Sequence, residues 1–313
     1  MSAEPAPRIS VIIPVFNGEP FLSEQLDALA AQDFAEPWEL IISDNGSTDG
    51  TRALAMSRRG SFPVPLHILD ASAERGVNFA RNAGILAARA EKIAFCDADD
   101  RVFPTWLRAA FEELDTHEVV QGPLHVMRTA RDSNPPVLRH AIAERTAACG
   151  NLGIRRETLD RLGGFDVSCV RYGVADIEFA SRMWKAGVKD ALVPEFGIDY
   201  RLMESSWGFL RKIWSSCIAE VEVWRRHPEA YPDKHGRGYV AREALLFVPH
   251  IVTAARGGGL RRAVRVVITL AAHAVAMLPP APELPEPRLL DSMPAVPEVG
   301  AGEAGVDDER VAN

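Results

Sequence analysis

The strongest constraint in this sequence is an alternation of strand-like and helix-like segments over its first hundred residues or so. Short apolar runs rich in β-branched residues alternate with segments whose apolar residues recur at helical spacing. Strands are expected at 9–16, 38–43, 64–69 and 92–96, and helices at 19–32, 51–59 and 77–90. This order predicts an α/β fold with a Rossmann-like, doubly wound and mostly parallel sheet that carries helices on both faces.

The second half of the chain is less regular. We expect an extended strand over 117–127, a loop over 128–140 and a short strand at 150–154. Helices are expected at 106–114, 157–162, 177–186, 207–226 and 261–278, and the last of these would belong to a C-terminal helical extension. Residues 279–313 are dominated by Pro, Glu and Gly, which predicts disorder.

The composition excludes several classes of protein. With 313 residues, 47% of them hydrophobic, the chain suits one large domain or one and a half and is not globally disordered. The net charge is −8, and eight acidic residues against two arginines in 280–313 account for most of it. The body is therefore nearly neutral, and we expect no nucleic-acid partner. The four cysteines form no CxxC pair, so neither a disulfide framework nor a structural zinc site is expected, and a reducing cytoplasm fits best.

Two segments bear on the expected localisation. Residues 1–10 contain no apolar h-region, so no secretory signal is expected there. The apolar run 263–278 is interrupted by Arg265 and His273 and is shorter than the ~20 residues that a membrane span needs. The helix from Arg261 to Leu278 leaves two interpretations open, an ordinary packed helix or peripheral contact with the inner face of an anionic membrane.

Three acidic residues, Asp97, Asp99 and Asp100, follow the fourth predicted strand directly. The carboxyl ends of the strands form the ligand-binding edge of such a sheet. Like charges so close together repel one another, and hard carboxylate oxygens suit Mg²⁺ or Mn²⁺, which usually also contact substrate phosphates. A solvated acidic turn that caps the next helix is the alternative.

Other polar residues are expected at the same edge. Asp44 ends the second strand, where it could accept from a ribose hydroxyl or a base N–H, or form an Asx-turn or a helix cap. Asn78, Arg81 and Asn82 share one helix face that suits a diphosphate, with a solvated face as the alternative. The sequence contains no GxGxxG or GxxxxGK[ST] loop, which disfavours a dinucleotide dehydrogenase or a P-loop enzyme.

Five segments of the chain together resemble the motifs of family 2 glycosyltransferases. They read SVIIPVFNG at 10–18, SDNGSTDG at 43–50, RGVNFARNAG at 75–84, DAD at 97–99 and LGGFD at 162–166. The resemblance covers roughly residues 9–215, and the order and spacing of the five motifs make it specific. It implies a GT-A fold, a nucleotide-sugar donor, a divalent cation (Mn²⁺ or Mg²⁺) and inversion at the anomeric carbon.

The resemblance also implies roles for individual residues. Asp44 would bind the base, and Asp97 would contact the ribose or the sugar. Asp99 would hold the metal together with Asp97, and Asp199 would complete the metal shell where the family often has a histidine. The donor site as a whole is implied to comprise Pro14, Val15, Asn17, Glu19, Asp44, Asn78, Arg81, Asp97 and Ala98.

Asp176 is implied to be the general base. In the family the base lies in a Glu-Asp pair that opens a helix after the GGFD element, and here that pair reads Ala175-Asp176. One carboxylate at this place would deprotonate the acceptor hydroxyl. The alternative roles are a helix N-cap for Asp176 and a surface ion pair between Glu178 and Arg182.

These assignments lead to one expected activity and two alternatives. The expected activity is sugar transfer from a nucleotide-sugar, a UDP-sugar first and a dTDP- or GDP-sugar otherwise, to a hydroxyl of a carbohydrate, lipid-linked, protein or small-molecule acceptor. A nucleotidyltransferase is one alternative, although PVFNG at 14–18 stands where its GxGxR loop would be. A catalytically decayed nucleotide-sugar-binding protein is the other, favoured by Ala175, by Asn45 in place of a frequent aspartate and by the missing histidine.

The expected organisation of the chain has five parts. A flexible N-terminus precedes two halves of one catalytic unit, and an extension and a tail follow. The parts are the N-terminus at 1–8, a nucleotide-sugar-binding half at 9–127, an acceptor-binding and catalytic half at 128–226, a helical extension at 227–278 and a disordered acidic tail at 279–313.

Overall fold

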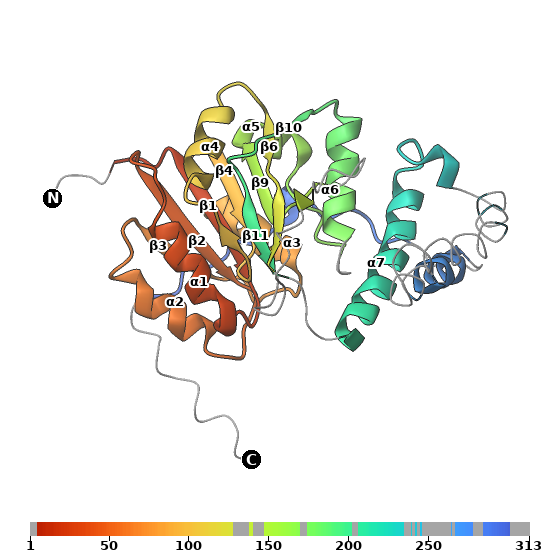
Figure 1. Ribbon diagram of the computed structural model, residues 1–313, viewed down its shortest axis with the longest axis horizontal. Coiled ribbons are helices and arrows are strands. Elements are labelled where there is room, and N and C mark those ends of the chain that lie inside the picture. Colours follow the sequence, from red (N-terminus) through yellow and green to blue (C-terminus); the bar gives the residue numbers. More distant parts are fainter. Residues whose placement is uncertain are drawn as a thin grey trace, which may run out of the picture.

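In the computed structural model, a seven-stranded sheet lies at the centre of the molecule (Figure 1). Its order is β10-β6-β9-β4-β1-β2-β3, and only β9 runs antiparallel to its neighbours. The strands are β1 Ile9–Val15, β2 Trp38–Asp44, β3 Leu66–Asp70, β4 Lys92–Cys96, β6 Val119–Gln121, β9 Asn151–Arg155 and β10 Asp190–Leu192. The mostly parallel sheet is confirmed, and the four strands expected in the first half are all present. The structure describes residues 5–127, 138–139, 147–169, 174–201, 206–234, 239, 242, 245, 264, 267–277 and 284–300.

A second, four-stranded sheet has the order β5-β11-β7-β8. Its strands are β5 Arg101–Val102, β7 Leu124–Met127, β8 Leu138–Arg139 and β11 Ile198–Arg201. The single strand expected over 117–127 is wrong, because β6 and β7 belong to different sheets. The break falls at Gly122, where an added Cβ would lie 1.5 Å from the carbonyl oxygen of Phe196. Pro123 has no N–H for a ladder, which also favours a break at this point.

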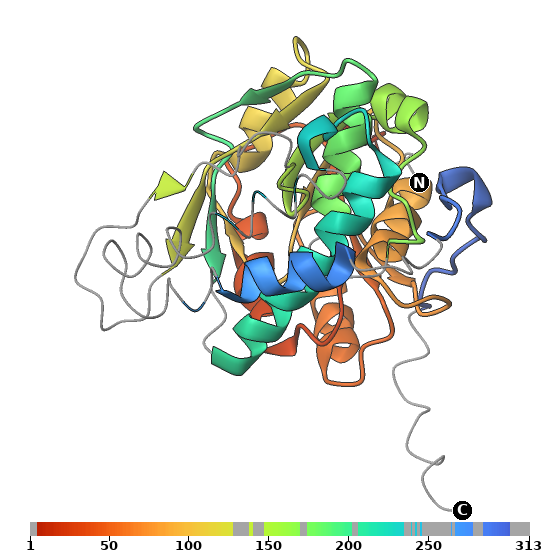
Figure 2. The ribbon, with the colours of Figure 1, turned by 90° about the vertical axis from the view of Figure 1, so that its right-hand side faces the viewer.

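The C-terminal helices form an extension beside the main sheet (Figures 1 and 2). Helix α7, Ser206–Arg226, packs against residues 267–277 and contributes Ala219, Val221 and Trp224 to a separate apolar cluster. No described helix is both long and apolar enough to cross a membrane. Arg261, which begins the segment expected to contact a membrane, lies outside the described residues, and that contact stays a prediction.

The segment 284–300 lies against the body of the protein, so the expectation of disorder is wrong for these residues. The N–H of Val299 donates to the carbonyl oxygen of Ile68 at 2.7 Å, and the N–H of Asp70 donates to that of Pro297 at 2.9 Å. These bonds cover the free edge of β3. Three side chains of the segment also pack on the main core: Leu290, Met293 and Val296. The expectation rested on the high content of Pro, Glu and Gly, but apolar residues that can pack on the core lie among the prolines. The prolines also restrict the unfolded chain, which reduces the conformational entropy lost when the segment docks.

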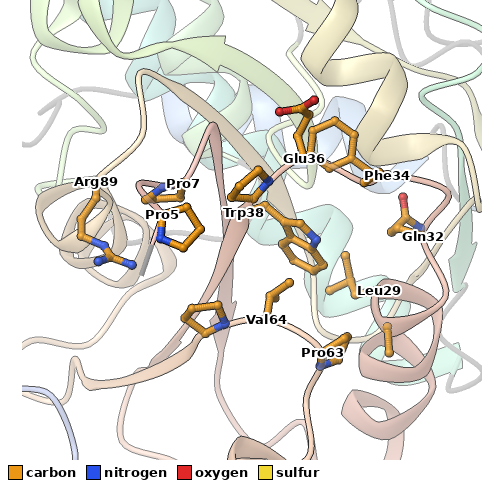
Figure 3. A pocket seen from close by; sticks show the side chains of 14 residues that line it. Pro5, Pro7, Leu29, Gln32, Phe34, Glu36, Trp38, Pro63, Val64 and Arg89 are labelled. Carbon is orange, nitrogen blue, oxygen red and sulfur yellow. The ribbon is translucent and has the colours of Figure 1, made fainter. Parts of the chain in front are cut away.

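The amino edge of the main sheet contains a cavity of about 470 Å³ (Figure 3). Residues at or before the starts of the strands line it, and they include Phe34, Trp38, Val64 and Arg89. The cavity therefore lies at the edge opposite to the carboxyl ends of the parallel strands.

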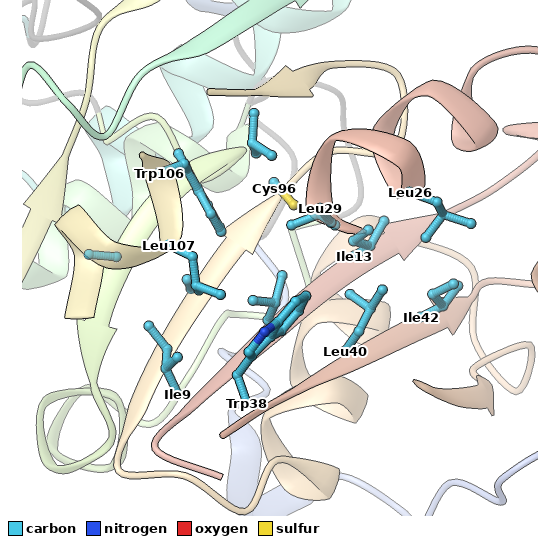
Figure 4. Close-up of a cluster of buried hydrophobic side chains, with 14 of the residues drawn as sticks. Ile9, Ile13, Leu26, Leu29, Trp38, Leu40, Ile42, Cys96, Trp106 and Leu107 are labelled. Carbon is cyan, nitrogen blue, oxygen red and sulfur yellow. The ribbon is translucent and has the colours of Figure 1, made fainter. Parts of the chain in front are cut away.

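Helices cover both faces of the main sheet, as predicted. One face packs against α1 Glu19–Ala30, α2 Thr51–Arg59 and α4 Trp106–Glu113 (Figure 4). The other packs against α3 Val77–Ala87, α5 Arg156–Leu162 and α6 Val174–Lys185. The side chains of β1 alternate between the two faces, with Ile13 on the first and Ile12 on the second. Both faces are largely apolar, which explains why every residue of β1 except Ser10 is apolar.

Candidate active site

Two polar residues after β1 hold the loop that follows β2. Asn17 has a φ of 52°, a conformation that asparagine adopts more readily than most residues. Its N–H donates to Ser47 Oγ at 2.9 Å, and its Oδ1 accepts from the N–H of Thr48 at 2.8 Å. Glu19 Oε2 accepts from the N–H of Gly50 at 2.8 Å. Asn17 and Glu19 thus help to shape this loop, in addition to the place in the donor site that the resemblance implies.

The apolar residues expected in the donor site, Pro14, Val15 and Ala98, are buried beneath these loops. Gly18 lies between two of them. A Cβ at Gly18 would be 2.6 Å from Val15 Cγ2 and 3.5 Å from Ala98 Cβ. The absence of a side chain therefore lets the loop after β1 approach the loop after β4, which brings two of the predicted motifs together.

Asp44 is buried at the end of β2, and both of its carboxylate oxygens have partners. Oδ1 accepts from the N–H of Ser47 at 2.9 Å, which is the local turn that sequence offered as the alternative to base binding. Oδ2 accepts from Arg52 Nε at 2.9 Å, and Arg52 also pairs with Asp70 at 3.2 Å. The carboxylate thus orders the loop, and its contact with a base stays a prediction.

Asn45, which replaces a frequent aspartate, is also buried and fully used. Its Nδ2 donates to the carbonyl oxygens of Ala71 and Glu74 at 2.6 and 2.7 Å, and its Oδ1 accepts from the N–H of Gly76 at 2.7 Å. An aspartate could make the last of these bonds and neither of the first two. The substitution therefore fits its surroundings and is no sign of a decayed site.

Asp97, Asp99 and Asp100 each place one carboxylate oxygen within 4.8 Å of the others. Burial raises the pKa of Asp100 to about 8, the charges of Asp97 and Asp99 act in the same direction, and the N–H of Arg201 opposes them. A divalent cation would relieve this repulsion, and three carboxylates form the hard oxygen donor set that Mg²⁺ and Mn²⁺ prefer. The group therefore fits such an ion. The ligand set implied by the resemblance did not include Asp100, although the sequence shows it directly beside Asp99 in the same acidic run.

Asp199 does not join this acidic group, so its predicted place in the metal shell is wrong. Asp199 lies opposite Arg101 in the antiparallel pairing of β11 with β5. Its Oδ2 accepts from Nε and Nη2 of Arg101 at 3.0 and 2.6 Å. The cross-strand partner thus neutralises the carboxylate, and a strand register of this kind is not visible in the sequence.

Arg81 of α3 lies between the acidic group and α6. Its Nη2 is 3.4 Å from Asp97 Oδ1, and its Nη1 is 3.9 Å from Asp176 Oδ1. The side chain is only 4% exposed, and its Nε and Nη1 have no hydrogen-bond partner within the described part of the chain. Arg81 therefore brings the proposed donor residue and the proposed base to one place, with unused donors that could meet an anionic ligand.

Asp176 lies in the first turn of α6, which already begins at Val174. The N-cap role considered for it is therefore wrong, because a cap precedes the helix. Burial raises the pKa of Asp176, Arg81 opposes this shift, and Asp97 adds to it. A raised pKa makes a carboxylate a better proton acceptor near neutral pH. Glu178, on the same helix, is buried with Arg182, so the surface pair expected there is wrong.

The other two polar residues on this face of α3 hold the loop of the GGFD element. Asn78 Nδ2 donates to the carbonyl oxygen of Asp166 at 2.8 Å. Asn82 Nδ2 donates to the carbonyl oxygen of Phe165 at 2.8 Å, and its Oδ1 accepts from the same residue's N–H at 2.9 Å. Gly164, with a φ of 68°, leaves room for Asn82, since a Cβ would lie 2.8 Å from its Oδ1. The helix face is therefore buried against the second half of the protein.

Two further polar groups were not identified from sequence as parts of this framework. The buried carboxylate of Asp166 accepts from Arg226 Nη1 and from the N–H of Arg288. Asn151 is fully buried, where it accepts from Trp106 Nε1 at 2.7 Å and donates to the carbonyl oxygen of Phe196 at 3.0 Å. Asn151 therefore joins the start of α4 and the segment before β11 to β9 from a buried position.

The family model described as glycosyl transferase family 2 matches residues 10–171, about half of the chain. The chain belongs to this family. A provisionally named glycosyltransferase of Bacillus subtilis (strain 168), EpsE, is 30% identical over 221 residues, which cover 68% of this chain and 78% of EpsE. The first three curated relatives are matched over only 19% to 36% of their own length.

Two solved structures support the GT-A fold of this family 2 member. A mannosyltransferase from Pyrobaculum calidifontis, in complex with GDP-Man and Mn²⁺, has a TM-score of 0.58 at 22% identity, covering 87% of this chain and 86% of the other. Residues 1–349 of TarS from S. aureus, in complex with UDP-GlcNAc, have a TM-score of 0.52 at 15% identity, covering 86% and 90%. At these identities the likeness establishes the fold.

Proposed function

We propose that this chain is an inverting glycosyltransferase that moves a sugar from a nucleotide-sugar donor to an acceptor hydroxyl. The observation that carries the proposal is the contact of Arg81 with both Asp97 and Asp176. This contact places a carboxylate with a raised pKa beside an acidic group suited to a cation, at the carboxyl edge of the sheet.

In the proposed reaction, Asp176 accepts the proton of the acceptor hydroxyl. The acceptor oxygen then forms a bond to the anomeric carbon from the face opposite to the diphosphate, and the bond from that carbon to the diphosphate oxygen breaks. Asp97 and Asp99 would hold Mn²⁺ or Mg²⁺, with Asp100 beside them, and such an ion supplies charge stabilisation for the departing nucleoside diphosphate. The free N–H groups of Arg81 favour the same anion.

The donor proposed first is a UDP-sugar, with dTDP- and GDP-sugars as alternatives. The solved mannosyltransferase holds GDP-Man and the solved TarS structure holds UDP-GlcNAc, so either type of base is compatible with this fold. Acceptors of the carbohydrate, lipid-linked, protein and small-molecule classes all fit the proposal.

The test separates chemistry from binding. Asp176→Asn should lower transfer by about 10²–10⁴-fold, the usual contribution of a general base, and leave donor binding measured by calorimetry unchanged. Full turnover by this variant would overturn the assignment of the base. A wild-type protein that binds a donor and never transfers its sugar would favour the decayed alternative.

A matched pair of variants tests the metal ligands. Asp99→Asn should weaken Mn²⁺-dependent donor binding, because it removes a charge from the acidic group. Asp199→Asn should leave that binding intact, because its carboxylate faces Arg101. The opposite result would restore Asp199 to the metal site.

A further inference from the structure

A second cluster of potential metal ligands lies in the C-terminal extension, away from the proposed active site. Cys217 and Glu220 are three residues apart on α7 and therefore on one face of that helix. His273 comes from the helical segment 267–277 that packs against α7 (Figure 2). One ligand atom of each residue lies within 4.8 Å of the other two. His273 Nε2 and Glu220 Oε2 are 3.0 Å apart.

The surrounding contacts fix the position of this cluster. The ring centroids of Trp224 and His273 are 4.9 Å apart. Trp224 follows Cys217 by seven residues on α7, which is about two helical turns and places both on the same face. Arg225 Nη2 donates to the carbonyl oxygen of Ala276 at 2.5 Å, which ties the two helices together beside the cluster. Trp224 thus packs against the His273 ring, and the bond from Arg225 joins the two helices without using any of the three side chains.

The chemistry of these donors points to one kind of ion. A thiolate, an imidazole and a carboxylate are the three side-chain ligands that Zn²⁺ takes, whereas Mg²⁺ and Mn²⁺ favour sets of oxygens. Cys217 and His273 are buried, and Glu220 is 29% exposed. One side of the cluster therefore faces water, which could enter with the ion and complete a tetrahedral shell.

We propose that Cys217, Glu220 and His273 bind Zn²⁺ and that this ion fastens the C-terminal helical segment to α7. Binding requires Cys217 as the thiolate and His273 as the neutral imidazole, so the protons they carry are released to water and the two electron pairs are donated to the ion. No structural zinc site was expected from the sequence, because the cysteines form no CxxC pair. The ligands proposed here lie at a Cys-x-x-Glu spacing on one helix and 53 residues beyond Glu220 on another.

The test uses the full chain, freed of metal with a chelator and titrated with Co²⁺ as a spectroscopic substitute for Zn²⁺. We expect a thiolate-to-cobalt charge-transfer band that saturates at one equivalent and disappears when Zn²⁺ is added. Ions bound at Asp97, Asp99 and Asp100 cannot produce this band, because that group contains no sulfur. The result is therefore independent of the proposed glycosyltransferase activity.

Variants assign the band to its residues. Cys217→Ser should abolish it, Glu220→Gln should weaken cobalt binding about 10-fold or more, and Cys149→Ser should leave it unchanged, since Cys149 lies outside the cluster. Circular dichroism checks the fold of each variant. A wild-type protein without the band at saturating Co²⁺ overturns the proposal whatever the variants do, and so does a band that survives in Cys217→Ser.

Discussion

Replacing Glu178 with glutamine tests the buried ion pair that organises the second half of the protein. Arg182 donates to the two carboxylate oxygens of Glu178 at 2.7 and 2.8 Å, and His227 Nε2 lies 3.3 Å from Oε1. Arg182 Nη1 also donates to the carbonyl oxygen of Leu162. The carboxylate therefore joins α6 to His227, the residue that follows α7, and it also holds Arg182, which in turn binds the end of α5.

The size of the effect follows from the pKa of Glu178. Burial alone would raise this pKa, but hydrogen bonds from His227 and Arg182 and the charge of Arg182 outweigh burial and lower it from 4.5 to about 2. At about 1.4 kcal/mol per unit, the ionised carboxylate contributes on the order of 3 kcal/mol to the free energy of unfolding at neutral pH. Glutamine resembles the protonated acid, so Glu178→Gln should lose about this amount at pH 7.

The sign of the pH dependence is fixed by the same shift. Because the pKa is lower in the folded state, the contribution is complete above pH 4.5 and is lost as the pH falls towards 2. The difference in unfolding free energy between wild type and Glu178→Gln should therefore shrink to about half near pH 3.

The assay is urea unfolding followed by tryptophan fluorescence between pH 7 and pH 3. Glu157→Gln is the matched control, since Glu157 is an exposed residue of α5, and it should change stability by less than about 0.5 kcal/mol. Equal stability of wild type and Glu178→Gln at pH 7 would refute the reasoning. So would a difference between them that stays constant down to pH 3.

Two further predictions follow from contacts of the carboxyl edge and the tail. Gly150→Ala should weaken metal-dependent donor binding and change the unfolding midpoint little, because a Cβ would lie 2.3 Å from Asp97 Oδ2 and must displace that carboxylate. Calorimetry measures the binding and thermal unfolding measures the midpoint. A lower midpoint with unchanged donor binding would contradict this prediction. Removing residues after 283 should speed hydrogen exchange at the N–H of Asp70, which donates to Pro297. Unchanged exchange at Asp70 in the shortened chain would contradict the docking of the tail on β3.

The fold of the first half could be predicted from sequence because its signals are local. Parallel strands covered on both faces need continuous apolar runs, and helices packed on one side need apolar residues at helical spacing. Both patterns lie within single segments. The bounds of β1, β2 and β4 therefore agree with the expected ranges to within a residue or two.

The parts that sequence did not predict depend on pairings between distant segments. Asp199 follows an apolar segment much as Asp44 does, yet its partner Arg101 is set by the register of two short strands. The docking of 284–300 similarly depends on the free edge of β3, 200 or more residues earlier in the chain. The composition of the tail describes only the tail, so it cannot show that a free strand edge is available elsewhere in the protein for the tail to bind.

The three polar residues of α3 explain how the two halves of the proposed site stay in register. Asn78 and Asn82 bind backbone groups of the GGFD loop, and Arg81, on the same helix face, contacts Asp97 and Asp176. The same helix thus holds the GGFD loop and carries the arginine that lies between the proposed donor residue and the proposed base. A shift of that loop would have to move α3, and with it Arg81. The distance between Asp97 and Asp176 is therefore set by the packing of one helix face. The sequence pattern identified the residues of this face, and the structure shows that the face is buried against the protein.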